Sequence, residues 1–226
     1  MLLFAAAAMP SLAQTQGDAM MNMQEVAQSL GVECGYCHAR MGQNAQPAAA
    51  DAPPGAPSKL TIAAAMMAMT RDLNAKIVAA TGKPSNEATR VTCITCHRGV
   101  AVPGQLSDII TKTTLQKGPD AAIAQYRELR TRYYGHQAYD FAEDTLLTAA
   151  AQIARVKPKD SIPILRLNLE FYPKSVRSYT QIAFAYTRSL DDESAINTLE
   201  KALEIEPENG MVRGQLEQLK SYRRRK

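Results

Sequence analysis

The sequence contains only four cysteines, and all four belong to two short segments of the form CxxCH. The first segment is CGYCH at residues 34–38, and the second is CITCH at residues 93–97. The chain has only three histidines, and two of them directly follow these cysteine pairs. Composition alone would put two of three histidines at those positions with a probability of roughly one in several thousand. The pairing therefore constrains what the chain can do.

A CxxCH segment is typical of covalent attachment of a c-type haem. Two intervening residues let both thiols reach the two vinyl groups of one porphyrin edge, and the adjacent histidine then lies under the iron as proximal ligand. The sequence thus predicts two covalently bound c-type haems per chain. Their predicted attachment and proximal residues are Cys34, Cys37 and His38, and Cys93, Cys96 and His97.

Other sites built from CxxC pairs fit this sequence less well. A structural zinc site uses four thiolates, which two CxxC pairs could supply, but it does not require a histidine after each pair. Thioredoxin-like chemistry needs one CxxC at a helix start within a βαβ pattern, and no such pattern is present. We do not expect structural disulfides within the pairs.

Methionine is the candidate for the sixth ligand of each iron. The third histidine, His136, lies far along the chain from both segments, so bis-histidine ligation of both haems within one chain is impossible. Of ten methionines, three precede each segment: Met20, Met21 and Met23, then Met66, Met67 and Met69. A single methionine usually fills a core gap. Periodicity alone does not choose among the three at each site.

The N-terminal half is expected to hold a leader and the haem domain. Residues 1–13, MLLFAAAAMPSLA, have the apolar and cleavage regions of a secretory signal peptide, although no Lys or Arg precedes Arg40. A frayed apolar N-terminus is the alternative. Residues 14–105 form the predicted dihaem cytochrome domain, with one helix that stops at Gly31 and another over residues 60–80 that is ended by Gly82.

The C-terminal half is predicted to be a helical repeat domain, so that the fold class is all-α. Residues 106–118 are expected to be a linker, and residues 119–226 a tetratricopeptide-like domain with a leading helix over 119–133. In a 34-residue register ending at Pro207, every packing position is apolar, aromatic or small: Tyr179, Ile182, Ala183, Tyr186, Ala195, Leu199 and Ala202. One register earlier the match is degenerate, because Asn168 replaces the last small residue and Thr145 and Gln152 replace the tyrosines.

The net charge of +4 depends on the last four residues, Arg223 to Lys226. Such an end is usually a solvated tail, with docking to an anionic membrane surface or an acidic partner as the alternative. We predict no nucleic-acid binding and find no transmembrane run.

Three stretches resemble haem-binding segments of the cytochrome c subunit of photosynthetic reaction centres: SLGVECGYCH at 29–38, MMAMTRDLN at 66–74 and VTCITCHRG at 91–99. The resemblance covers about residues 20–103, and the repeats lie outside it. It implies a helix that supplies an axial methionine, a turn, and CxxCH on a second helix. Aligned in this way, it implies Met23 and Met66 as the axial ligands. That family typically carries four haems, so the chain resembles half of the subunit.

These features together predict a periplasmic dihaem c-type cytochrome that transfers one electron at a time and is not an enzyme. Filled axial positions in both oxidation states suit this role, because little rearranges on electron transfer. Redox protein partners are expected to dock on the repeat domain, and peripheral membrane association is possible. The alternatives are an electron donor subunit of a reaction centre or another membrane redox complex, a dihaem peroxidase-like enzyme with one open distal side, and a scaffold with accessory haems.

Overall fold

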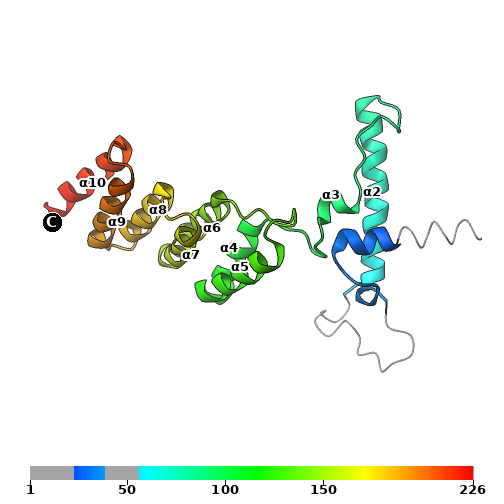
Figure 1. Cartoon of the computed structure of the whole chain (residues 1–226), viewed down its shortest axis with the longest axis horizontal. Helices are drawn as coiled ribbons and strands as arrows, with labels where there is room; N and C mark the ends of the chain where they lie inside the picture. Colours follow the sequence, from blue (N-terminus) through cyan, green and yellow to red (C-terminus); the bar gives the residue numbers. More distant parts are fainter. Residues whose placement is uncertain (1–22, 39–55, 226) are drawn as a thin grey trace, which may run out of the picture. The chain divides into compact units, whose positions relative to one another are not determined.

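The computed structural model describes residues 23–38 and 56–225 (Figure 1). Every regular element in these two ranges is helical, which confirms the all-α prediction. The chain divides into two compact units, one ending at Pro103 and the other beginning at Gly104. The predicted signal segment 1–13, Met20 and Met21 lie outside the described residues.

The first unit is built around one long helix, α2 (Lys59–Thr81). Ser58 caps its start by accepting a 3.1 Å hydrogen bond from the backbone N–H of Thr61. Its end is fixed by Gly82, which adopts the left-handed conformation with φ +64°. The helix predicted over residues 60–80 is therefore confirmed.

Three shorter pieces complete the described part of the first unit. Residues 23–30 are helical and end at Gly31, as predicted, with φ +63°. The two CxxCH segments form the three-residue η1 (Cys34–Tyr36) and the five-residue α3 (Cys93–His97).

The second unit is a series of seven helices within residues 104–225, each packed on the next from α6 onward (Figure 1). In chain order they are α4 (Leu106–Lys117), α5 (Pro119–Tyr133), α6 (Glu143–Val156), α7 (Pro158–Phe171), α8 (Val176–Arg188), α9 (Asp192–Ile205) and α10 (Gly210–Arg223). Helix α5 has the bounds predicted for the leading helix. Helix α4 packs on both α5 and α6, and α5 also packs on α7.

The linker expected over residues 106–118 is instead helix α4, and this expectation was wrong. Leu106, Ile110 and Thr114 recur every four residues along it and are all buried. Three of its twelve residues are threonine, and polar residues fill most of the other positions, so its apolar face is narrow and its helix propensity is weak. Packing on α5 and α6 is what stabilises it.

Two apolar cores fill the second unit, one shared by α4 to α8 and the other by α8 to α10. Of the seven packing positions named from the sequence, five are buried: Ile182, Ala183, Ala195, Leu199 and Ala202. The two tyrosines, Tyr179 and Tyr186, are half-buried against these cores.

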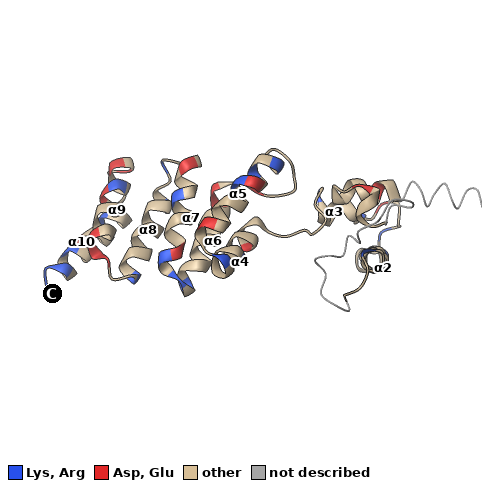
Figure 2. Cartoon of the chain, turned by 90° about the horizontal axis from the view of Figure 1, so that it is seen from below, with Lys and Arg blue, Asp and Glu red and all other residues tan. Residues whose placement is uncertain are grey.

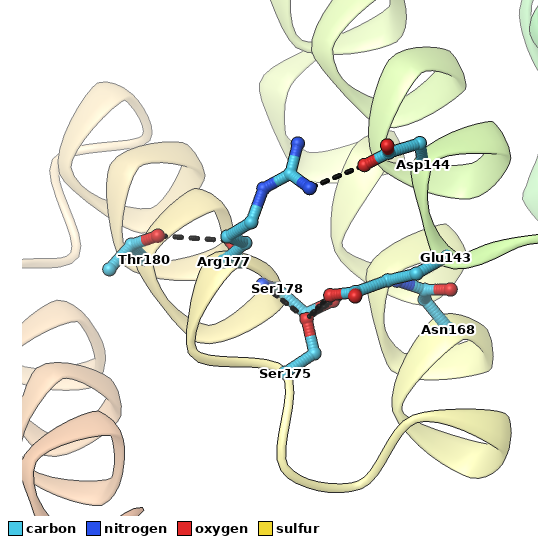
Figure 3. A network of polar contacts seen from close by, with 7 residues as sticks. All are labelled: Glu143, Asp144, Asn168, Ser175, Arg177, Ser178 and Thr180. Atoms are coloured by element: carbon cyan, nitrogen blue, oxygen red, sulfur yellow. Dashed lines mark hydrogen bonds and ion pairs between the residues drawn. The ribbon is translucent and has the colours of Figure 1, made fainter. Parts of the chain in front are cut away.

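Where the sequence repeat degenerates, the helices are joined by polar contacts (Figure 3). Asn168, fully buried, donates a 2.9 Å hydrogen bond from its side-chain amide to Ser178 Oγ. Ser178 N–H donates to Ser175 Oγ at 3.0 Å, and the Ser175 hydroxyl donates to the Glu143 carboxylate. Side-chain hydrogen bonds between α6, α7 and the start of α8 thus replace part of the close packing there.

Candidate functional site

The second CxxCH segment is a well-formed single turn of helix. The backbone N–H of Thr92 donates a 3.0 Å hydrogen bond to Thr95 Oγ1, which fixes the start of α3. The helix ends at His97 because Arg98 and Gly99 both take positive φ, at +50° and +86°. Since Cys93 and Cys96 are three residues apart on this turn, both thiols lie on one side of it.

The imidazole of His97 is oriented by the chain itself. Its Nδ1 lies 3.0 Å from the carbonyl oxygen of Val100, and Val100 is buried. A carbonyl oxygen can only accept, so in the neutral imidazole Nδ1 carries the proton and Nε2 is the nitrogen with a free lone pair. A proximal haem ligand requires this tautomer and a fixed ring.

The first CxxCH segment contains less regular helix than the second. Cys34 lies in η1, and Cys37 and His38 follow it, with Cys34 and His38 exposed. The ammonium of Lys59 at the start of α2 lies 3.6 Å from the centre of the Tyr36 ring. This cation–π contact attaches the segment to one end of α2.

All four cysteines are free thiols, and no disulfide joins them. Within residues 23–38 and 56–225, no three His, Cys, Asp or Glu side chains lie close enough together to hold one metal ion. The arrangement of a four-thiolate zinc site is therefore not present among the described residues. Burial, followed by the nearby carboxylate of Glu25, raises the pKa of the Cys93 thiol above its usual value.

Asn74 on α2 holds the chain just before α3. Its side-chain amide donates to the carbonyl oxygen of Val91 and its Oδ1 accepts from Val91 N–H, both at 2.8 Å. The same helix contacts Tyr36 through Lys59, fifteen residues earlier, which is about 22 Å along the axis. Helix α2 thus holds both CxxCH segments.

The helix of residues 23–30 packs directly on the turn after α3. Gly99 N–H donates a 2.9 Å hydrogen bond to the carbonyl oxygen of Ser29, and Ser29 is buried. Gly31 approaches this turn so closely that an added Cβ would overlap the Gly99 carbonyl oxygen and lie 2.9 Å from its carbon. The two predicted haem segments are therefore in backbone contact.

The methionines of α2 occupy different sides of the helix. At about 100° per residue, Met67 lies about 20° around the axis from Asn74, Met66 about 80° and Met69 about 140°. Met67 is half-buried, whereas Met66 and Met69 are 44% and 54% exposed. Met66 thus lies at the edge of the face that holds Val91, and Met69 lies beyond it. Met23, within the described helical residues 23–30, is exposed.

A cavity of about 640 Å³ opens between α2 and residues 85–90. Arg71 and Arg90 line it, together with the side chain of Asn74. Two guanidinium groups suit carboxylates, and a haem carries two propionates. Asn74 is the last residue of MMAMTRDLN, and the sequence alone predicts no role for it; an asparagine inside a helix, where its propensity is low, is the available signal.

The described residues contain no helix long and apolar enough to cross a membrane. His136 is exposed in the turn between α5 and α6 of the second unit.

Comparison with known proteins gives one family. A family model described as photosynthetic reaction centre cytochrome C subunit matches residues 57–179, more than half of the chain. A search of curated proteins finds no match. The matched region contains α2, Asn74 and the second CxxCH segment, whereas the first segment precedes it. The matched region also includes α4 to α7. The expectation that the C-terminal repeats lie outside the resemblance is therefore wrong for the residues up to 179.

Proposed function

The chain belongs to the photosynthetic reaction centre cytochrome c subunit family, and from this we propose that it is a periplasmic dihaem c-type cytochrome that carries one electron at a time. The family is one of c-type cytochrome electron carriers with covalently bound haem. The observation that best supports the proposal is the hydrogen bond between His97 Nδ1 and the Val100 carbonyl oxygen. It leaves Nε2 free beside two thiols on one turn of helix.

Each protein group has a distinct role in this proposal. Cys34 and Cys37, and Cys93 and Cys96, form the thioethers that hold the two haems. His38 and His97 would be the proximal iron ligands, and Met23 and Met66 would be the distal ones. When bound, each haem supplies an iron that alternates between ferric and ferrous states.

The surrounding groups position these ligands. Asn74 fixes the distance between α2 and the second CxxCH segment through its two hydrogen bonds to Val91. Arg71 and Arg90 in the adjoining cavity would pair with propionate carboxylates. With a histidine and a methionine as its ligands, each iron would be closed to water and peroxide, which would favour electron transfer over peroxidase chemistry.

The second unit would act as the docking part of the protein. We propose that it is a tetratricopeptide-like module that binds a redox protein. The burial of Ile182, Ala183, Ala195, Leu199 and Ala202 supports this. The family match favours one more specific role, that of an electron donor to a membrane redox complex such as a reaction centre.

Mass spectrometry of protein purified from a bacterium that attaches c-type haem tests this proposal. We expect the mass of the mature chain plus two haems, with the N-terminus cleaved near Ala13 and the protein in the periplasm. The variant Cys93→Ser/Cys96→Ser should carry one haem, and Cys34→Ser/Cys37→Ser should carry the other. A mass that fits the polypeptide with zinc, or with no addition, would show that the proposal is wrong.

A further inference from the structure

Two hollows on the second unit share one exposed aromatic side chain. A cavity of about 430 Å³ lies between α8 and α10, and one of about 290 Å³ lies between α6 and α8. Phe184 lines both and is 56% exposed. The two hollows therefore adjoin at Phe184, and together they are here named the α6–α8–α10 groove.

The lining of the α6–α8–α10 groove carries charge of one sign. Three arginines line it, Arg155 on α6, Arg188 on α8 and Arg225 after α10, and all three are exposed. None of the described residues that line either hollow is acidic. Residues 104–226 hold nineteen Lys and Arg against sixteen Asp and Glu, so this separation of charge is local to the groove. Figure 2 shows the positions of acidic residues, in red, at other places along the second unit.

The other lining groups suit an extended backbone. Gln181, Gln215 and Gln218 each offer an amide donor and acceptor, and Thr180 and Thr187 offer hydroxyl groups. The Arg188 guanidinium lies 5.9 Å from the centre of the Phe184 ring, so the ring and the charge stand next to one another.

We propose that the α6–α8–α10 groove binds an extended acidic segment of a partner protein. Carboxylates of the segment pair with Arg155, Arg188 and Arg225, and an aliphatic side chain between them packs on Phe184. The inference rests on the proposed function, because the partner is the redox protein that docks on the second unit. It adds the surface, the charge and the conformation of what docks.

Fluorescence titration of the haem-loaded full chain tests this. The probe is a labelled peptide of sequence Glu-Ala-Glu-Leu-Glu-Ala-Glu, and its matched control has lysine in place of every glutamate. We expect the acidic peptide to bind with an affinity that falls as salt rises, and the lysine peptide not to bind. Arg155→Gln/Arg188→Gln should weaken binding about tenfold or more, since each change removes one charge-assisted contact. Lys112→Gln/Lys201→Gln, which removes two exposed charges outside the groove, should leave it unchanged.

Phe184→Ala is the second variant. It should reduce affinity for the leucine-containing peptide and not for one with alanine in its place. Equal binding of the acidic and lysine peptides, no binding of the acidic peptide, or full binding by the Arg155/Arg188 variant would overturn the proposal. So would displacement of the peptide by a second copy of the chain or by anionic lipid vesicles. Reversible haem reduction is recorded on the same samples. Peptide binding lost with intact reduction refutes this inference alone, and reduction lost with intact peptide binding refutes only the proposed function.

Discussion

Replacing Gly31 with alanine should break the contact between the two predicted haem segments. Gly31 has φ +63°, and an added Cβ would overlap the carbonyl group of Gly99. Gly82 provides a matched control, since its φ is +64° and an added Cβ would meet nothing within 4 Å. Both substitutions carry the same backbone cost, so their difference isolates the contact with Gly99.

The loss of folding free energy in Gly31→Ala can be added up from the backbone cost and from the contacts that the displaced Gly99 turn loses. An L residue in the left-handed conformation costs about 1–2 kcal/mol, which is the whole expected effect of Gly82→Ala. At Gly31 the Gly99 turn must also retreat, because a Cα-type carbon and a carbonyl oxygen approach only to about 3.3 Å. That movement loses the hydrogen bond from Gly99 to Ser29, about 1 kcal/mol. Partial exposure of Val100 adds about 1–2 kcal/mol. We therefore expect Gly31→Ala to destabilise the first unit by about 3–5 kcal/mol.

Urea unfolding of the haem-loaded protein, followed by haem absorbance, measures this difference. Gly31→Ala should shift the haem transition to lower urea, and Gly82→Ala should shift it much less. The reduction potential of the second haem should also change in Gly31→Ala, since the turn that moves includes the carbonyl group facing His97. Equal destabilisation by the two substitutions would refute the reasoning, because it would mean that Gly31 and Gly99 are not in contact.

Three further predictions concern single side chains. Met66→Leu should remove the methionine-ligand absorbance of one haem and lower the reduction potential of that haem, at a packing cost below about 1.5 kcal/mol. Met67→Leu and Met69→Leu should leave that absorbance band in place. Loss of the band in Met67→Leu or Met69→Leu instead would assign the ligand to that residue. Asn74→Ala removes both hydrogen bonds to the backbone ahead of α3 and should destabilise the first unit by about 1–3 kcal/mol in the same urea assay; an unchanged transition would contradict its positioning role. Burial raises the pKa of the Tyr126 hydroxyl in the folded protein above its usual value of 10.0. The neutral hydroxyl therefore contributes fully to folding stability at pH values below the pKa of the unfolded chain, and this contribution is lost as pH rises through the pKa of the folded protein. Unfolding at about pH 8 and pH 11 should show a smaller alkaline loss for Tyr126→Phe than for the wild type, and equal losses would exclude this tyrosine as the cause.

Local signals were sufficient for the elements that have strong start and stop residues. Helix α2 begins after the Ser58 cap and ends at Gly82, and helix α5 begins at Pro119 just after Gly118. Helix α4 ends at Gly118 but has no start signal of this kind, because its N-cap residue Gln105 makes no side-chain hydrogen bond. Its stability comes from neighbours that sequence periodicity does not reveal.

In the candidate site, too, local features follow from the sequence, whereas long-range contacts do not. The spacing of CITCH predicts thiols and histidine on one turn, and α3 shows that turn. The bonds from Asn74 to Val91 and from Gly99 to Ser29 join residues 17 and 70 positions apart. Contacts at such separations depend on how helices approach one another, so a single sequence does not predict them. Sequence periodicity does not choose among Met66, Met67 and Met69 for the same reason, since the choice depends on which side of α2 faces the second CxxCH segment.

The most direct test of the central claim is a spectroelectrochemical titration that counts electrons per chain. A dihaem cytochrome should take up two electrons reversibly in two one-electron steps, with the absorbance of low-spin, methionine-ligated iron in the oxidised protein. Cys93→Ser/Cys96→Ser should take up one. A chain that accepts no electrons reversibly, or whose oxidised spectrum shows an open, high-spin iron, would contradict the account.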